Sequence, residues 1–395
     1  IMALVKTNRF ILNGELINYE KNHLKLFRKN VKENELPMWV ADMDFKTCPA
    51  VIDALNKRVA HGIFGYQRES DTWAEAYINW WKRRHHLDIK KEWLIFCTGV
   101  VPAISTTVRK LTTPAENVIV ITPAYNIFFN SIYNNGRNIV ECELAYEDGK
   151  YELDYEDLED KCSNPQSTLL ILCNPHNPTG IIWSKEQLAK IGDICAKHNV
   201  TVLSDEIHCD ITLPGCEYTP FAAASTVCEQ ISVNCISPTK AFNMAGLQSA
   251  AVCIPNANLR HKVWRALNTD EVAEGNAFAA DVAIAAFNNG EEWLEELREY
   301  LANNRHLAEE YIKENIQALS VVKGQATYLL WIDCSKLGKS SDELAEYIRE
   351  KTGLYLSEGC EYRGDGRNFL RMNLACPRAR LEEGLDRLKQ AIECC

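Results

Sequence analysis

The chain has no Cys-x-x-Cys pair, although it contains 16 cysteines among its 395 residues. The cysteines are scattered, mostly within apolar segments such as LLILC and AAVCI, which is typical of buried reduced thiols and disfavours disulfides or a zinc site. The sequence also lacks the run of about 18 apolar residues that a membrane helix requires. Its first residues, IMALVKTNRF, lack the long apolar region of a secretory signal. We therefore expect a cytosolic protein without a metal site.

Positive charge is scarce as well. The 43 lysines and arginines are outnumbered by 54 acidic residues, which gives a formal net charge of -11 and no basic run. Nucleic acid and anionic membranes need a basic surface, so neither is expected as a main partner. A hydrophobic content of 46% and a charged content of 25% indicate a soluble globular protein. Its length allows two or three domains.

Short apolar runs alternate with helical stretches from about residue 93 onward. The runs are WLIFC, NVIVIT, NIVECEL, LLILC, TVLS, ISVNCI and AAVCI. This alternation predicts an α/β domain with a seven-stranded, mostly parallel sheet covered on both faces. One of the covering helices is well marked, because Ser184 and Gln187 form a capping box before an apolar periodic segment.

The texture changes after about residue 288 to long charged helices around two strands, YLLWIDC and the region near FLRMNLA. This pattern predicts a second, smaller α+β domain. No repeat, low-complexity segment or Pro/Gly/Ser linker is present, so the domain boundaries are inferred only from this change in sequence pattern. We expect residues 1–48 to pack with the small domain, 49–287 to form the large domain and 288–395 to form the small one.

Ligands bind at the carboxyl ends of strands in open parallel sheets, so the loops after the apolar runs are the places to search. After WLIFC, Gly99 and Pro102 flank Val100 and Val101, whose amides would lie at the positive end of a helix and could hold a phosphate. An ordinary strand-to-helix turn is the alternative. After NVIVIT, Tyr125 could stack on a planar ring, or it could belong to the core.

Three further strand ends carry polar groups. Asn177 lies in NPHNPTG, where two Asn-Pro steps favour a turn that presents its amide, although a purely structural double turn is the alternative. Asp205 follows TVLS, and a carboxylate there needs a cationic partner or several donors. Lys240 follows ISVNCI and is either turned out to water or held for its amine.

Pyridoxal phosphate (PLP) is one ligand that could contact all five features together: the phosphate-binding turn, the aromatic ring, the amide donor, the carboxylate and the amine. Lys240 would be its Schiff-base lysine. The chain also resembles the fold type I PLP enzymes of the class I/II aminotransferase superfamily, and within them the C–S lyase branch of MalY/PatB-type cystathionine β-lyases and cystalysin. The resemblance covers nearly the whole chain and is carried, in the family's order, by LPMWVADMDF, FGYQ, TGVVPAI, CNPHNPTG, SDEIHCD, SPTKAFNMAGLQ and FLRMNLACPR.

The resemblance implies a role for each residue around the cofactor. Asp205 would pair with the pyridine nitrogen, Asn177 and His208 would lie near the phenolic oxygen, and Tyr125 would stack on the ring. Ser237 would join Val100 and Val101 at the phosphate. Tyr66 would reach the phosphate of the neighbouring subunit, which would make the enzyme a homodimer.

The resemblance also implies an amino-acid substrate. Arg371 would clamp the substrate carboxylate, since a guanidinium fork suits this bidentate contact. A surface arginine paired with a neighbour is the alternative. The backbone near Ala41 would line the same pocket. Asn126, a further candidate substrate contact, stands where some lyases carry a second tyrosine, and Gln248 stands where aminotransferases often have a phosphate-binding arginine.

The implied activity is β-elimination from cystathionine or cysteine-type L-amino acids, which gives a thiol, pyruvate and ammonia. An aminotransferase would use the same residues, so the first choice depends on the closer similarity to the lyase branch. A regulatory role as a protein-binding partner, with which the MalY type is also associated, is the alternative from another class.

Overall fold

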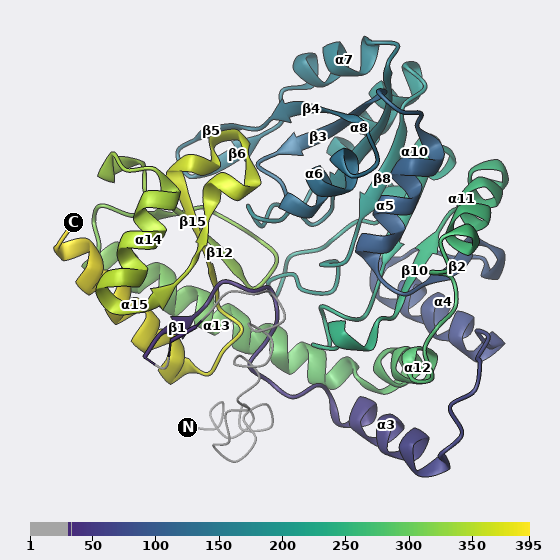
Figure 1. Cartoon of the computed structure of the whole chain (residues 1–395), viewed down its shortest axis with the longest axis horizontal. Helices are drawn as coiled ribbons and strands as arrows, with labels where there is room; N and C mark the ends of the chain where they lie inside the picture. Colours follow the sequence, from purple (N-terminus) through teal and green to yellow (C-terminus); the bar gives the residue numbers. More distant parts are fainter. Residues whose placement is uncertain (1–30, 33) are drawn as a thin grey trace.

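The computed structural model describes residues 31, 32 and 34–395 and contains a sheet of seven strands and a sheet of four (Figure 1). The large sheet has the order β2-β10-β9-β8-β7-β3-β4, and only β10 runs antiparallel to its neighbours. Its strands are β2 (Leu94–Cys97), β3 (Asn117–Thr122), β4 (Asn138–Glu143), β7 (Ser167–Cys173), β8 (Thr201–Asp205), β9 (Ser232–Ile236) and β10 (Ala250–Cys253). Each coincides with one predicted apolar run, so the predicted sheet is confirmed.

Helices cover both faces of the large sheet because its strands are apolar on both sides. Val202 and Leu203 are adjacent in β8 and point to opposite faces, and each belongs to a different buried apolar cluster. The predicted capping box of Ser184 and Gln187 is confirmed at the start of α8. The helices of this part are α3 (Pro49–His61), α4 (Asp71–His85), α5 (Val100–Leu111), α6 (Asn126–Tyr133), α7 (Tyr155–Ser163), α8 (Lys185–Lys197), α9 (Phe221–Ala224), α10 (Thr226–Ile231), α11 (Ala257–Thr269) and α12 (Ala279–Asn289).

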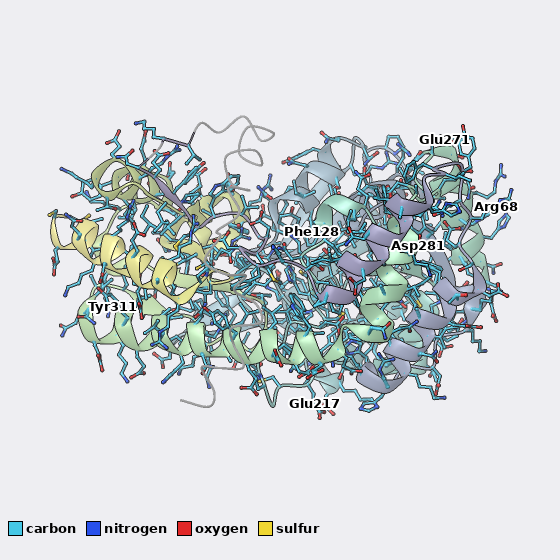
Figure 2. The ribbon with its side chains drawn as sticks, turned by 90° about the horizontal axis from the view of Figure 1, so that it is seen from below. Arg68, Phe128, Glu217, Glu271, Asp281 and Tyr311 are labelled. Atoms are coloured by element: carbon cyan, nitrogen blue, oxygen red, sulfur yellow. The ribbon has the colours of Figure 1, made fainter. Side chains whose placement is uncertain are left out.

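The smaller sheet has the order β11-β12-β15-β14. The predicted strand pair is confirmed as β12 and β15, which are antiparallel and place Trp331 opposite Arg371. Figure 2 shows the long helix α13 running along the molecule, with Tyr311 towards its far end. The elements of this part are β11 (Ser320–Val321), β12 (Leu329–Asp333), β14 (Ser357–Glu358), β15 (Phe369–Asn373), α13 (Glu291–Asn315), α14 (Ser341–Thr352) and α15 (Arg378–Glu393).

Two short strand pairs complete the fold. Strands β5 (Ala145–Glu147) and β6 (Lys150–Glu152) form a hairpin that lies near β15 (Figure 1). Strand β1 (Leu36–Pro37) runs parallel to β13 (Leu354–Tyr355). The Asn373 side chain then donates hydrogen bonds to the carbonyls of Val40 and Asp42, at 2.5 and 2.7 Å. These contacts fix the segment around residue 41 beside the small sheet.

The predicted packing of residues 1–48 with the small domain can be followed only from residue 31, since residues 1–30 and 33 lie outside the described residues. The domain boundaries at residues 48 and 287 stay a prediction.

Across residues 31–395, residue 33 excepted, no helix is long and apolar enough to cross a membrane. All the cysteines lie within this range, and each is a free thiol. The prediction of buried reduced thiols is confirmed for most of them, because only Cys360, Cys394 and Cys395 are exposed and Cys216 is half-buried.

Candidate active site

The residues singled out in the sequence follow strands of the large sheet at one of its edges. Strands β7, β8 and β9 are parallel neighbours, with Cys173, Asp205 and Cys235 side by side in their register. Strands β2 and β3 run in the same direction as these three. The loops after all five strands therefore leave the sheet at the same edge, where a ligand is expected.

Lys240, in the loop after β9, is half-buried, and its Nζ donates a hydrogen bond to the Ala41 carbonyl. Removal from water lowers the pKa of this amine to about 8, although the carboxylates of Asp42 and Asp205 act in the opposite direction. The amine is thus directed at protein groups instead of solvent. Of the two interpretations of this lysine, the structure favours the one in which the amine is held for chemistry.

The Ala41 carbonyl also accepts a hydrogen bond from the Tyr328 hydroxyl, at 3.0 Å. Ala41 was predicted to line a carboxylate pocket, and the structure places its carbonyl against Lys240. Tyr328 was missed in the sequence because it opens the run YLLWIDC, where an aromatic residue is typical of a core strand. Only the contact with the segment around residue 41 distinguishes it.

Asp205 is the last residue of β8 and is 4% exposed. Its Oδ1 accepts a hydrogen bond from the backbone N–H of Ile207 at 3.1 Å. Burial raises the pKa of this carboxyl to about 7, while the Ile207 N–H and the charge of Lys240 lower it. A carboxylate in this position favours a cationic group, because a nearby positive charge would restore its ionised form.

Arg371, on β15, is 5% exposed, so the alternative of a surface arginine is wrong. Its Nη1 donates to Asn177 Oδ1 at 3.2 Å, and its Nη2 donates to the Trp39 carbonyl at 2.9 Å. Its buried Nε has no hydrogen-bond partner within the described part of the chain. Arg371 thereby uses the acceptor oxygen of Asn177 and leaves the amide nitrogen of that side chain as a donor towards the site.

His208 is buried, and its Nδ1 has no hydrogen-bond partner among the described residues. Burial lowers the pKa of the ring to about 3, and the charges of Lys240 and Arg371 lower it further. The imidazole is therefore neutral at physiological pH. An orphaned ring nitrogen beside Lys240 and Arg371 indicates that a polar ligand atom belongs there.

Val100 and Val101 are the first two residues of α5, after the N-cap Gly99. Their N–H groups have no acceptor within the helix and lie at its positive end, which suits an anion. Pro102 occupies the third helical position. Its missing N–H costs little there, because the first four N–H groups of a helix have no partner within the helix.

Ser237 is buried, and its hydroxyl donates to the Ser249 carbonyl at 2.8 Å while accepting the Thr239 N–H at 3.1 Å. The phosphate contact predicted for Ser237 therefore requires this hydroxyl to change its partner on binding. That contact stays a prediction.

Tyr125 is the N-cap of α6 and Asn126 is the first residue of that helix. The Tyr125 ring lies 5.7 Å from the Phe128 ring at 82°, and burial raises the pKa of its hydroxyl to about 12. The Phe128 side chain is buried. Tyr125 is thus a neutral aromatic group fixed at the edge of the site, and no contact in the structure tests the substrate role predicted for Asn126.

Tyr66 is the predicted site residue that is fully exposed, in the connection between α3 and α4. Ile63 and Phe64 beside it are 67% and 52% exposed. Apolar side chains gathered on one exposed segment are typical of an interaction surface. Within one subunit, Tyr66 is not part of the group of buried site residues.

Apart from Tyr66, these residues together offer an anion site at α5, an aromatic ring, an amide donor, a carboxylate, an amine and a guanidinium. Such a set can hold a phosphorylated, planar, cationic heterocycle and place an amino acid carboxylate beside it. The arrangement is suited to removing a proton from the α-carbon of an amino acid, with the amine of Lys240 as the base.

Comparison with known proteins supports this interpretation. Residues 34–388 match the family model for aminotransferase class I and II. The chain is 40% identical over 386 residues to cystathionine beta-lyase PatB of Bacillus subtilis (strain 168), which covers 95% of this chain and 100% of that protein.

Two solved structures are similar over almost the whole chain. A PLP-bound protein from Clostridium difficile 630, described as an aminotransferase, has a TM-score of 0.92 and 42% identity and covers 96% of this chain and 98% of its own. Cystalysin from Treponema denticola, whose structure contains PLP, has a TM-score of 0.91 and 31% identity and covers 96% of both chains.

Proposed function

This chain belongs to the aminotransferase class I and II family, and we propose that within it the protein acts as a PLP-dependent C–S β-lyase. Its substrates are cystathionine and cysteine-type L-amino acids, which it cleaves to a thiol, pyruvate and ammonia. The observation that carries the choice of lyase is the 40% identity to PatB over nearly the full length of both proteins. Cystalysin, at a TM-score of 0.91, supports the same choice.

The residues present fit PLP. The orphaned Nδ1 of His208 and the Asn177 amide supply partners for a phenolic oxygen, and the buried Asp205 carboxylate suits a protonated ring nitrogen. The N–H groups of Val100 and Val101, with Ser237, suit a phosphate. When bound, PLP withdraws electrons from the bonds at the α-carbon of an attached amino acid.

The protein residues then control binding, orientation and proton transfer. Arg371 holds the substrate carboxylate, which sets the direction of the Cα–H bond towards Lys240. Lys240 removes this proton, and its lowered pKa of about 8 leaves a useful fraction of the amine neutral near neutral pH. Asp205 keeps a proton on the ring nitrogen. Loss of the Cα proton allows a thiolate on the β-carbon to leave.

Thiol release tests the proposal directly. The purified protein mixed with L-cystathionine should release free thiol continuously, detected with a thiol-reactive dye. A blank without substrate corrects for the exposed cysteines of the protein, Cys360, Cys394 and Cys395. Thiol that does not rise above this blank would contradict the lyase proposal.

Arg371→Lys should raise the KM for the amino acid about 10- to 100-fold and change kcat less. Lysine keeps the charge but loses one arm of a bidentate contact, and a charge-assisted hydrogen bond contributes roughly 1.5–3 kcal/mol. Steady-state kinetics measure the effect. Arg367→Lys, at an exposed arginine four residues away, is the matched control and should leave KM unchanged. Equal KM values for both variants would exclude Arg371 as the carboxylate clamp.

We further propose a homodimer in which Tyr66 reaches the cofactor phosphate of the neighbouring subunit. The exposed Ile63, Phe64 and Tyr66 support it, because they form an apolar surface that a second copy would cover. The free thiols suit a reducing compartment, so we also propose that the protein is cytoplasmic.

Tyr66→Phe should weaken cofactor binding about tenfold by removing one hydrogen bond to phosphate. Mixing Tyr66→Phe subunits with Lys240→Ala subunits should recover activity at limiting cofactor, because each mixed dimer contains one site with both native residues. If Tyr66 served its own subunit, activity after subunit exchange would equal the average of the two parent proteins.

An aminotransferase is the second candidate, favoured by the description of the Clostridium difficile protein at 42% identity. The buried residues described above serve both reactions. Product analysis therefore decides between the two.

A further inference from the structure

Arg363 has an unusual backbone conformation. It lies between the short helical turns η4 (Gly359–Tyr362) and η5 (Gly364–Asn368), with φ 58° and ψ -160°. This region is populated almost only by glycine, because a Cβ is strained there. A residue held in this conformation needs surrounding contacts that keep it there, and such positions are frequent at functional sites.

The Arg363 side chain makes such contacts with strand β4 and helix α6 of the large-sheet part. Its Nη1 donates to Glu141 Oε1, in β4, at 2.9 Å. Its Nη2 donates to the Tyr133 hydroxyl at 3.1 Å, and its guanidinium carbon lies 4.4 Å from the centre of the Phe129 ring. Tyr133 and Phe129 both belong to α6, the helix that begins directly after Tyr125. One side chain from the small-sheet part is thus fixed to the helix beside the site.

The residue before Arg363 connects the same loop to the site. The Tyr362 carbonyl accepts the backbone N–H of Ala124, the neighbour of Tyr125, at 2.7 Å. The Tyr362 ring lies under the guanidinium of Arg371, whose Cζ is 4.9 Å from the ring centre. Tyr362 therefore lies between the turn that carries Tyr125 and the arginine that faces the substrate.

The residue after Arg363 is packed closely as well. Gly364 has φ 54°, and a Cβ added to it would lie 3.2 Å from the backbone nitrogen of Pro123. The loop thus fits tightly against the turn between β3 and α6. The Tyr362 ring of this loop packs against the flat face of the Arg371 guanidinium. Asn177 and the Trp39 carbonyl accept hydrogen bonds from the edge of that guanidinium.

We propose that Arg363 is a positioning residue that sets the affinity of the site for the substrate carboxylate. Its contacts with Glu141, Tyr133 and Phe129 fix Tyr362, and Tyr362 fixes the plane of the Arg371 guanidinium. Arg363 itself touches neither Lys240 nor Asp205, so the chemical step is left unchanged. The inference rests on the proposed role of Arg371 as the carboxylate clamp.

Arg363→Gly is the variant of choice, because glycine accepts the backbone conformation while all three side-chain contacts are lost. It should raise the KM for L-cystathionine about tenfold and leave kcat within about twofold. Arg363→Lys, which keeps the ion pair with Glu141, should recover part of the affinity. Arg367→Ala, in the same loop but exposed, is the matched control and should behave as wild type.

Two readouts do not depend on turnover. The first is the dissociation constant of L-cystathionine, from the absorbance of bound cofactor in the Lys240→Ala background, and it should rise about tenfold with Arg363→Gly. The second is hydrogen exchange of the Ala124 N–H, which should become faster when the Tyr362 carbonyl is released. A wild type that binds L-cystathionine without releasing thiol would contradict the lyase proposal, and the dissociation constants would still test Arg363. Unchanged dissociation constants and unchanged exchange at Ala124, or a lower kcat at constant KM, would overturn the inference.

Discussion

Lys240→Ala should lose at least about a thousandfold in turnover of L-cystathionine. The variant lacks the amine that removes the Cα proton, and a positioned base alone contributes about 100- to 10,000-fold. The fold should be retained, because the Nζ of Lys240 makes a hydrogen bond to the Ala41 carbonyl and the Tyr328 hydroxyl still satisfies that oxygen. The measurement is the rate of pyruvate release at saturating substrate and cofactor.

Lys262→Ala is the control for this variant. Lys262 is an exposed lysine on α11, outside the site, so its loss should leave the rate unchanged. Cystathionine cleavage by Lys240→Ala at the wild-type rate would remove Lys240 from the mechanism. The interpretation that the amine is held for chemistry would then be wrong.

Asp205→Asn should lose about 100- to 1,000-fold in turnover, the range observed when a preorganised electrostatic group is removed from an active site. Asparagine preserves the shape of the side chain but carries no charge, so it does not keep a proton on a ring nitrogen. Cofactor affinity should fall in the same variant. The measurements are the rate at saturating cofactor and the cofactor dissociation constant.

In the absence of cofactor, Asp205→Asn should increase the free energy of unfolding at neutral pH, although the same substitution lowers turnover. Burial raises the pKa of Asp205 from 3.8 to about 7 in the folded protein, so the ionised carboxylate disfavours the fold. The penalty is absent below about pH 4, grows as the pH rises from about 4 to about 7, and is complete above pH 7. A shift of this size corresponds to roughly 4 kcal/mol at most.

Asp205→Asn removes this dependence. The Tm of the variant minus that of the wild type should therefore increase between pH 4 and pH 7. Glu206, whose pKa is also raised to about 7 by burial, is present in both proteins, and the Asp205 carboxylate raises that pKa further, so the change at Glu206 acts in the same direction as the change at Asp205. A Tm difference that stays constant over this range would show that ionisation of Asp205 does not lower the free energy of unfolding.

The sequence predicted the large sheet and the edge at which the site lies because both depend on local signals. The local sequence of an apolar run such as LLILC is enough to predict a strand. The carboxyl ends of parallel strands lie at one edge of the sheet, whatever the order of the strands. Asp205 and Lys240 could therefore be assigned to one site before any contact was known. Arg371 was assigned to the same site because the segment FLRMNLACPR resembles the corresponding segment of the fold type I PLP enzymes.

The contacts that complete the site could not be predicted, because they join segments far apart in the chain. The Ala41 carbonyl lies 199 residues from Lys240 and 287 residues from Tyr328. Nothing in the stretch YRGDG shows that Arg363, between Tyr362 and Gly364, adopts the glycine-like conformation. Such features arise from packing between the two sheets.

Elimination of a thiol from the β-carbon of an amino acid is the reaction that would distinguish this protein from an aminotransferase. The most direct test is to mix the purified protein with L-cystathionine in the absence of any keto acid and to follow pyruvate and the absorbance of bound cofactor together. We predict sustained pyruvate release over many turnovers, with the original cofactor band retained. A single stoichiometric loss of that band, reversed only by adding a keto acid, would contradict the account and identify an aminotransferase.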